Sequence, residues 1–577
     1  MPGRSPSSST LSLLTLSLLA TSAWVPACSD DVSGNESAST TGNADEVDTS
    51  GSSDSESSSS SSTDSSTGPM DTGTMDTGPM DTTPTDTGPM DTSTDTSSTD
   101  TTESTGGVMD MFIEPPPPPP IPENCDQALQ GNSTVGCLFY GVDLDSHDAV
   151  ENQQFAIAVS NVQENQVATV QVEQKQGNSW GVISGPTMVQ ALDLAIFNLP
   201  AFSQDDSGIK AGGAYRVSSD VPIIAYQFNP IDGASSYLSD ASMLYPVPTW
   251  DHINHVVGWK VIDDGNVQGA YLTVVAAKDG TSVKITPSVT TLAGNGIPPS
   301  PAGVAFTINL NEGDIAEVMT KNMNQGLTGS RVESDADHPV AVFSGNECTF
   351  IPTNVYACDH LEEQLAGVRL WGQHFIASRV PPRSAQPDTS LWQIYASEDA
   401  TTITITRDPQ VTGIPSDQFV LNAGQVTEIY VGGTAAIPGD FEVEADKPIA
   451  VLNYMTGSEN PGAGIGDPAM IQLSPIEQFL PRYVVLVPGT WINDVAVIAR
   501  PAGAPITLDG APIDNGLFIP VADSGYEVAR VPVTDGIHVL DGDQNAFSVI
   551  IIGFDQWDSY AYLGGTGTGV INPNPVG

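Results

Sequence analysis

The sequence predicts an all-β protein, with about four β-sandwich-like modules in tandem after a disordered N-terminal tether. The first observation is composition: the 577 residues include 55 Gly and 45 Pro but only 17 Lys and Arg, and long helix-forming runs are scarce. The second is a pair of strands around an Asp-x-Pro corner, which occurs three times. The third is the spacing of these corners, about 100–117 residues, which leaves room for some seven strands per copy. A β-propeller with several blades per copy is the alternative.

Residues 1–28 are predicted to be a lipoprotein-type signal peptide. Arg4 is followed by "LSLLTLSLLA", an apolar run of about ten residues that is too short to span a bilayer. The next segment, "WVPACSDD", resembles the lipobox of bacterial lipoproteins, with Val25 and Ala27 before Cys28. We therefore expect lipidation of Cys28 and export to the outer membrane or cell surface, where two acyl chains suffice for stable anchoring. Ordinary secretory cleavage near this point is the alternative.

Residues 29–124 have the composition of a disordered acidic tether. They are rich in Ser, Thr, Asp and Pro and contain neither Lys nor Arg. Pentapeptides such as "GPMDT" repeat over 68–92, without the apolar periodicity of a helix or a strand. Such a chain repels itself and stays extended, and the proline run at 115–120 adds a stiff polyproline II segment. We expect the tether to hold a folded head away from the surface.

The head, from residue 125 onward, contains one strand pair three times. In each copy an alternating strand leads through an Asp-x-Pro corner into an apolar strand, because Pro can begin a strand without a ladder donor and Asp can accept hydrogen bonds in a turn. A fourth copy ends in "FSVIIIGF" at 547–554, with Asp543 and Gln544 in place of the corner. The three corners are Asp220 to Pro222, Asp337 to Pro339 and Asp446 to Pro448.

The segments before two of these corners also repeat. "AYLTVVAAKDGTSVKITP" at 270–287 matches "SLWQIYASEDATTITITR" at 390–407. Each is predicted to form two alternating strands joined by an acidic turn. The repeats divide the head into four β modules, which in chain order are 125–250, 251–365, 366–475 and 476–577.

The charge balance excludes nucleic acid as a partner. The chain has 70 acidic and 17 basic residues, a formal net charge of −53. Binding to phosphates requires a basic surface, which this composition does not supply. The expected partners are an extracellular protein or glycan for the head and a membrane for the N-terminal lipid anchor.

Five segments of the head resemble a known family. They are "GCLFYGVDLDS" at 136–146, "YRVSSDVPIIAYQFNP" at 215–230, "CTFIPTNVYACDHLEEQL" at 348–365, "WGQHF" at 371–375 and "DSYAYLGGTG" at 558–567. Together they are similar to the IgG Fc-binding protein N-terminal domain family, and in particular to its secreted and lipid-anchored bacterial members, such as those of myxobacteria. The resemblance spans 125–567. Its most specific motif includes Cys348, Cys358, Asp359, His360, Gln364, Trp371 and Gly372.

This resemblance implies an extracellular β-rich binding or matrix module without a catalytic site. We predict neither a cofactor nor a metal ion. The main functional hypothesis is a non-catalytic surface protein that binds or adheres to an extracellular partner through loops of its β modules. A structural component of a coat or matrix is the second hypothesis. An exported hydrolase that uses a carboxylate pair is the third.

The cysteines fit an exported protein. If Cys28 is lipidated, four cysteines remain in two close pairs, Cys125 with Cys137 and Cys348 with Cys358. An oxidising environment favours disulfides, although pairing across the two groups stays open.

The segment from Cys348 to Cys358 is predicted to close on itself as a structural disulfide. Pro352 and the polar residues after it favour a bend between the two sulfurs. Asp359 is expected to cap a short helical turn, with His360 as a hydrogen-bonded neighbour. Two alternatives are a zinc site made by both cysteines and His360, and a Cys358 nucleophile with His360 as its base.

Overall fold

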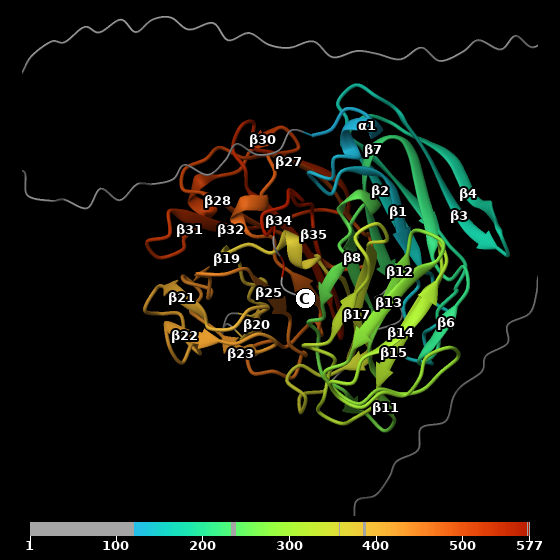
Figure 1. Ribbon diagram of the computed structural model, residues 1–577. Helices are drawn as coiled ribbons and strands as arrows, with labels where there is room; N and C mark the ends of the chain where they lie inside the picture. Colours follow the sequence, from blue (N-terminus) through green and yellow to red (C-terminus); the bar gives the residue numbers. More distant parts are fainter. Residues whose placement is uncertain (1–120, 232–237, 357, 385–387, 574, 576–577) are drawn as a thin grey trace, which may run out of the picture. The chain divides into compact units, whose positions relative to one another are not determined.

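β-strands make up nearly all regular structure in the computed structural model, which describes residues 121–573 and 575 apart from 232–237, 357 and 385–387 (Figure 1). The predicted all-β class is confirmed. Within the described residues the strands form separate sheets, and neither a closed barrel nor a propeller. The predicted signal peptide, Cys28 and the tether up to residue 120 lie outside this part of the chain. No helix that is described is long and apolar enough to cross a membrane.

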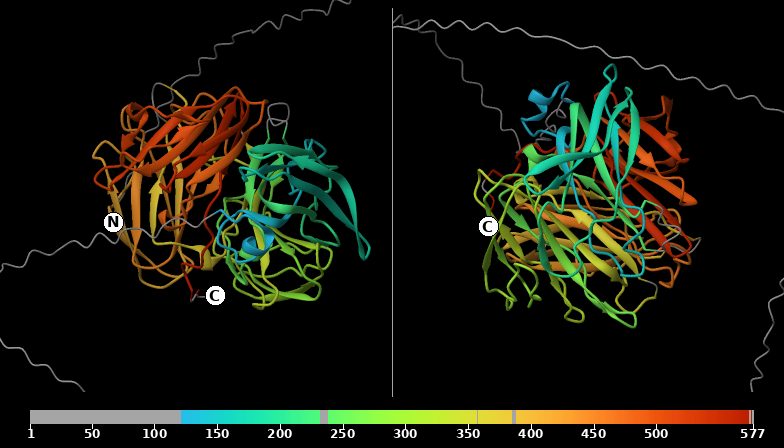
Figure 2. Two further views of the ribbon diagram at one scale, coloured as in Figure 1. Left: turned by 90° about the horizontal axis from the view of Figure 1, so that it is seen from above. Right: turned by 90° about the vertical axis from the view of Figure 1, so that its right-hand side faces the viewer.

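The first repeat contains seven strands that follow the short helix α1 (Cys125–Ala128). Their order is β4-β3-β7-β2-β5, and β1 and β8 also pair with β7. In both views of Figure 2 the teal hairpin of β3 and β4 extends away from the other strands. The strands are β1 (Gly136–Gly141), β2 (Ala156–Asn161), β3 (Ala168–Gln176), β4 (Ser179–Val189), β5 (Asp193–Asn198), β7 (Tyr215–Asn229) and β8 (Asp240–Leu244).

The second repeat has two sheets, of order β18-β17-β12-β15-β6 and β14-β13-β16-β9, and a small hairpin, β10-β11. All of its strands except β6 follow the 3-10 helix η1 (Val247–Thr249). Its strands are β6 (Gly208–Lys210), β9 (Ile253–His255), β10 (Ile262–Asp263), β11 (Val267–Gln268), β12 (Ala270–Ala276), β13 (Thr281–Thr286), β14 (Phe306–Leu310), β15 (Ile315–Thr320), β16 (Arg331–Glu333), β17 (Val340–Thr349) and β18 (Asp359–Gln364). Of these, β6 precedes β8 in the chain, so the sheet takes one edge strand from the segment of the first repeat.

The third repeat has two four-stranded sheets, β19-β24-β21-β22 and β23-β20-β25-β26. It follows the 3-10 helix η2 (Val368–Leu370). Its strands are β19 (His374–Ala377), β20 (Ser390–Ala396), β21 (Thr401–Arg407), β22 (Gln418–Leu421), β23 (Val426–Val431), β24 (Phe441–Ala445), β25 (Ile449–Tyr454) and β26 (Met470–Gln472).

The fourth repeat also has two sheets, β27-β33-β29-β30 and β31-β32-β28-β34-β35. Two 3-10 helices belong to it, η3 (Ile476–Gln478) and η4 (Asn515–Leu517). Its strands are β27 (Arg482–Val487), β28 (Asn493–Pro501), β29 (Thr507–Leu508), β30 (Ala511–Pro512), β31 (Ile519–Pro520), β32 (Tyr526–Pro532), β33 (Gly536–Asp541), β34 (Ser548–Asp555) and β35 (Asp558–Leu563).

One run of four strands recurs in all four repeats. It is β5-β2-β7-β8 in the first, β15-β12-β17-β18 in the second, β23-β20-β25-β26 in the third and β32-β28-β34-β35 in the fourth. The last strands of these runs meet: β8 contacts β18 and β35, and β26 contacts the same two strands. The four repeats are therefore joined through equivalent edge strands.

The Asp-x-Pro corners carry the chain from one sheet to the other. The corner at Asp337 leads from β16 to β17, and the corner at Asp446 leads from β24 to β25, in each case between two different sheets. The corner expected at Asp220 is wrong, because β7 continues through Pro222 without a turn. The strand changes partners there instead, from β1 and β3 to β2 and β8. Asp220 accepts a hydrogen bond from the Thr169 N–H at 2.6 Å.

The sequence pattern suggests that the two acidic turns at 277–280 and 397–400 close hairpins, but in the structure they do not. β12 and β13 lie in different sheets, and so do β20 and β21. The burial of the strands gives the reason: β12 and β20 are buried at every position, whereas β13 and β21 alternate. A strand buried on both faces needs covering layers that a one-sided strand does not.

Apolar packing explains this burial. In the second repeat Leu272 and Val274 of β12 pack against Val283 and Ile285 of β13 inside the sandwich. Tyr271 of β12 belongs instead to a second and larger core, which contains residues of all four repeats. The central sheets therefore bury one face within their own repeat and the other face against neighbouring repeats.

Candidate functional site

Each of the four joining strands carries an aspartate at or just before its start. Asp240, Asp359 and Asp558 are the first residues of β8, β18 and β35, and Asp467 lies three residues before β26. All four side chains are fully buried. We call them the junction aspartates. Because they follow equivalent strands, the fold brings one carboxyl group from every repeat to the same place.

Asp240 connects all four repeats through its side chain. Its Oδ2 accepts hydrogen bonds from the backbone N–H groups of Glu362 at 3.2 Å and Met470 at 3.0 Å. Its Oδ1 accepts one from Ala561 at 3.3 Å and one from Ala241 at 2.9 Å. Three of these donors belong to the joining strands of the second, third and fourth repeats. The carboxyl group of a single buried residue thus connects four edge strands that are otherwise separate.

The other junction aspartates make fewer bonds. Asp359 accepts the Ser239 N–H through Oδ1, and the Ser239 hydroxyl donates to Asp558 Oδ1 at 2.9 Å. Asp467 accepts a long bond from Ser458 N–H at 3.4 Å. In the described part of the chain, Oδ2 of each of these three aspartates is buried without a well-formed hydrogen bond.

Burial sets the protonation of this group. It raises the pKa of Asp558 to about 8, so this carboxyl is protonated at pH 7. Burial also raises the pKa of Asp359, and the charges of Asp558, Asp467 and Asp240 raise it further. For Asp240 burial raises the pKa as well, while its four backbone N–H partners favour the charged form. The junction therefore holds fewer charges than four carboxylates would carry in water.

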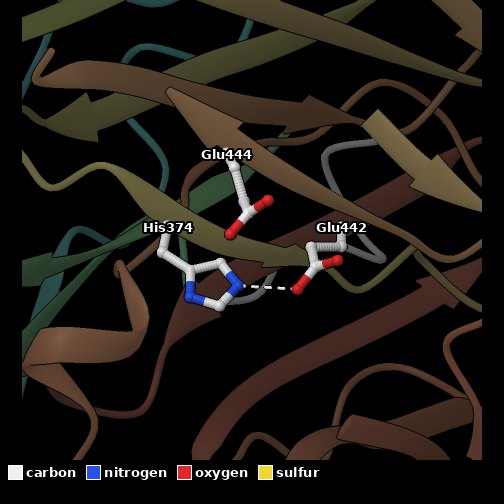
Figure 3. A group of neighbouring side chains, drawn as sticks. All are labelled: His374, Glu442 and Glu444. Carbon is white, nitrogen blue, oxygen red and sulfur yellow. Dashed lines mark hydrogen bonds and ion pairs between the residues drawn. The ribbon is translucent and has the colours of Figure 1, made fainter. Parts of the chain in front are cut away.

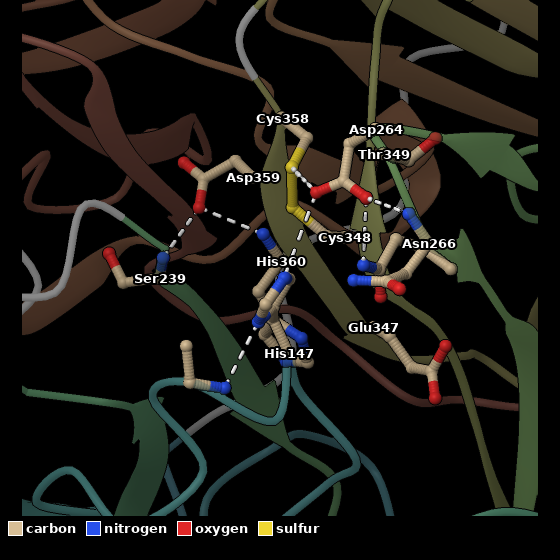
Figure 4. Close-up of a disulfide and its surroundings, with 12 residues drawn as sticks. His147, Ser239, Asp264, Asn266, Glu347, Cys348, Thr349, Cys358, Asp359 and His360 are labelled. Carbon is tan, nitrogen blue, oxygen red and sulfur yellow. Dashed lines mark hydrogen bonds and ion pairs between the residues drawn. A yellow bond between two sulfur atoms is a disulfide. The ribbon is translucent and has the colours of Figure 1, made fainter.

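A disulfide lies beside the junction. Cys348 and Cys358 are bonded, with 5.4 Å between their Cα atoms, and they connect the end of β17 to the residue before β18 (Figure 4). Cys125 and Cys137 form the other disulfide and connect α1 to β1. Since Cys348 and Cys358 are bonded to each other, this structure contains neither the alternative zinc site nor the alternative Cys358 nucleophile.

The residues after Cys358 form a strand and not the expected helical turn. β18 pairs with β17, and all six of its residues are buried. Asp359 Oδ1 does accept the His360 N–H at 2.8 Å, but the chain continues in an extended form. Long-range pairing with β17 has overridden the local capping signal.

The His360 side chain is packed inside the protein, and it lacks the well-formed hydrogen bond that was expected for it within the described residues. Neither ring nitrogen makes a well-formed hydrogen bond within the described residues, and a Glu362 oxygen lies 3.8 Å from Nε2. Burial lowers the pKa of His360 to about 4, although the carbonyls of Asn346 and Glu347 favour the charged form. The imidazole is therefore neutral at pH 7.

The remaining motif residues hold neighbouring segments in place. The Gln364 side chain accepts the Tyr245 N–H at 2.8 Å, which connects the first and second repeats. Trp371 Nε1 donates to the Ala366 carbonyl at 2.9 Å. At Gly372 a Cβ atom would lie 2.4 Å from Pro475 Cβ, so the chain can approach η3 here only because a side chain is absent.

A second polar group lies on β19 and β24 of the third repeat. His374 is paired with Glu444 across the two strands, and Glu442 shares their face of the sheet. The three side chains point toward one another, and one ligand atom from each lies within 4.8 Å of the others (Figure 3). His374 Nε2 is 2.7 Å from Glu442 Oε1. Burial acts to lower the pKa of His374, but the Glu442 hydrogen bond and the surrounding carboxylates raise it overall.

Neither group was predicted from the sequence. The junction aspartates can be found by aligning the segments that follow the repeated apolar strands, "DASML", "DHLEEQ", "DPAMIQ" and "DSYAYL". The second group leaves a weaker signal, the alternating acids in "FEVEA", because His374 lies far from them in the sequence.

A family model described as IgGFc binding protein matches residues 240–553, more than half of the chain. The chain belongs to the IgGFc-binding protein family. The matched region begins at Asp240 and contains three of the four junction aspartates, the Cys348–Cys358 disulfide and the His374 group.

One curated relative in this family is the human (Homo sapiens) protein named IgGFc-binding protein. It is 28% identical to this chain over 305 residues, which are 52% of this chain and 5% of the human protein. The chain thus spans far less than two thirds of that relative.

Proposed function

We propose that this chain is an extracellular, non-catalytic binding protein. The observation that carries the proposal is the family match over residues 240–553, together with a curated relative whose name states that it binds IgG Fc. An exported protein is also consistent with two disulfides in the described residues. We propose a protein as the first partner to test, with a glycan as the alternative.

The proposal includes surface display. Cys28 would carry the lipid anchor, residues 29–124 would form the tether, and the four modules at 125–250, 251–365, 366–475 and 476–577 would form the head. In this proposal the chain is a bacterial lipoprotein member of its family, of the type found in myxobacteria. The lipobox-like "VPAC" and the acidic segment after it support this part.

The junction supports a head that presents its loops in a fixed arrangement. The Asp240 side chain accepts hydrogen bonds from backbone N–H groups of the three other repeats. Between the third and fourth repeats, Asp467 N–H donates to Ser559 Oγ at 2.8 Å. The proposed role of the motif residues Asp359, His360, Gln364, Trp371 and Gly372 is to maintain this arrangement. Loops between the strands would then contact the partner.

Surface plasmon resonance with the immobilised mature chain tests the binding function. The analytes are IgG Fc, a panel of secreted and matrix proteins, and a glycan array. Saturable binding of a protein analyte is the expected result. Absence of binding to every analyte, with ordered self-assembly of the chain in electron micrographs, would instead support a structural coat or matrix component.

A further inference from the structure

We propose that His374, Glu442 and Glu444 bind a divalent transition-metal ion of the Zn²⁺ type. No sequence motif predicted a metal site at these three residues, and this inference does not depend on the identity of the binding partner. It rests on three features of the third repeat: the geometry of the ligand atoms, the uncompensated charge around them, and the contrast with the same positions in other repeats.

The β-sheet supplies the geometry. His374 and Glu444 are directly opposite each other on β19 and β24, and Glu442 is two residues from Glu444 on the same face. The ligand atoms lie within 4.8 Å of one another, so a small adjustment of side-chain torsions places all three around one ion at the usual distances of about 2.0–2.2 Å. The backbone of two paired strands holds the three Cβ positions in place.

The charge around these residues is negative, and the described part of the chain supplies no Lys or Arg partner for it. His374 forms an ion pair with Glu442 at 2.7 Å, which accounts for one carboxylate. Among the described residues neither Glu444 nor the neighbouring Glu477 of η3 has an ion pair with Lys or Arg. Glu477 Oε2 is buried without a hydrogen-bond partner in this part of the chain. A bound dication would compensate these charges.

In two other repeats the acid equivalent to Glu444 has a basic side chain that neutralises its charge. The first residue of the edge strand is His374 in the third repeat but Ile253 in the second, where it pairs with Glu333. Glu333 has its own cation, Lys284 Nζ, at 2.8 Å.

In the fourth repeat the corresponding pair is Arg482 and Asp541, 2.8 Å apart. In the third repeat, therefore, the acid of this pair faces the imidazole of His374. The equivalent acid faces the alkyl side chain of Ile253 in the second repeat and the guanidinium of Arg482 in the fourth. An imidazole with two carboxylates on one face is a ligand set for a metal ion, and an arginine is not.

The ligand chemistry selects the ion. One imidazole nitrogen and two carboxylate oxygens suit Zn²⁺ and its neighbours, whereas Ca²⁺ and Mg²⁺ prefer oxygen ligands alone. The His374 side chain is 32% exposed, so solvent can complete the coordination. Tyr526 of β32 packs edge-on against the His374 ring, with 6.3 Å between ring centroids. The ion would therefore lie where the third and fourth repeats meet.

Isothermal titration calorimetry with ZnCl₂ tests the proposal on the full mature chain after treatment with a chelator. We expect one binding site per chain that CaCl₂ and MgCl₂ do not fill. Since loss of a residue that only supports a ligand weakens metal binding about 10–100-fold, loss of a ligand should weaken it by at least about 100-fold. Glu444→Gln is the main variant, because Glu444 is exposed and its amide keeps the shape of the side chain. His374→Gln is the second variant.

Glu333→Gln is the matched control, because it makes the same change at the equivalent position of the second repeat. It should leave Zn²⁺ binding unchanged. Titration with Co²⁺ gives an independent readout, since visible absorption bands report coordination by nitrogen and oxygen. Equal Zn²⁺ affinity in Glu444→Gln and Glu333→Gln would overturn the proposal, and so would a dissociation constant weaker than about 100 µM for the unmodified chain.

Discussion

Replacing Asp240 by alanine should weaken the whole head, although the substitution removes only one small side chain. Asp240 is fully buried and accepts four backbone hydrogen bonds, three of them from strands of other repeats. A buried donor left without an acceptor costs about 1–3 kcal/mol. Two of the three bonds are long, at 3.2 and 3.3 Å, so the lower part of that range applies. We expect the free energy of unfolding to fall by roughly 3–5 kcal/mol.

Asp467→Ala is the matched control for this experiment. Asp467 occupies the equivalent position in the third repeat and is equally buried, but among the described residues its side chain accepts a single hydrogen bond, from Ser458 N–H at 3.4 Å. Its removal should change the free energy of unfolding by less than about 1.5 kcal/mol, the net worth of one ordinary hydrogen bond.

Equilibrium unfolding in guanidinium chloride, followed by tryptophan fluorescence, measures both variants. Hydrogen exchange then locates the change: the amides of Glu362, Met470 and Ala561 should exchange faster in Asp240→Ala, although they lie in three different repeats. If the two variants lose equal stability, or if faster exchange stays within β8, Asp240 does not connect the repeats.

Three further predictions concern pH, the disulfide and the tether. Burial raises the pKa of Asp558 to about 8 and that of Asp143 to about 7. The stability that these carboxyls contribute is fully present below their pKa in the unfolded chain, near 4, and it is lost as pH rises through their pKa in the folded protein. His360 has the opposite effect, because burial lowers its pKa to about 4, but it acts only below the ordinary pKa of its unfolded state. The midpoint of thermal unfolding should therefore be higher at pH 5 than at pH 8, and this difference should be smaller in Asp558→Asn. A midpoint that rises from pH 5 to pH 8 would contradict the raised pKa of these carboxyls. Cys358→Ser should lower the free energy of unfolding by about 2–3 kcal/mol, measured without reductant, because the disulfide closes a short loop; no change would show that the bond contributes nothing. Deleting residues 35–114 should leave the melting temperature of the head nearly unchanged in calorimetry, and a drop of many degrees would show that the segment packs on the head.

The fold class and two of the three predicted corners, at Asp337 and Asp446, could be predicted from the sequence because their signals are local. Strand alternation and the Asp-x-Pro turns need only a few neighbouring residues. These local signals do not predict which sheet each strand joins. Alternation of apolar and polar residues shows which face of a strand is buried, but not which strands it pairs with. For this reason the acidic turns looked like hairpins, while β12 and β13 belong to different sheets.

The segment after Cys358 shows how tertiary pairing overrides a local signal. "DHLEEQ" has an N-cap residue and good helix formers, yet β18 is extended, because Leu361 and its neighbours pair with β17 around Asn346. No local sequence pattern predicts that Glu362 and Glu363 of this strand are buried.

The candidate sites depend on contacts across long stretches of sequence. The four junction aspartates are spread from Asp240 to Asp558, and His374 is 68 residues from Glu442. Composition and spacing describe neither group. An alignment of the repeats against one another would have revealed the aspartates, but only the fold brings His374 to the two glutamates.

Protease treatment of intact producing cells tests most directly whether a folded head is held outside the cell by a tether attached at Cys28. Brief exposure to a protease that cleaves unfolded chains should release a stable fragment that begins near residue 121 and keeps the Cys348–Cys358 disulfide. In Cys28→Ala the full-length protein should instead appear in the medium before any protease is added. A head that remains protected until the cells are lysed, or the same cell association in both proteins, would contradict the account.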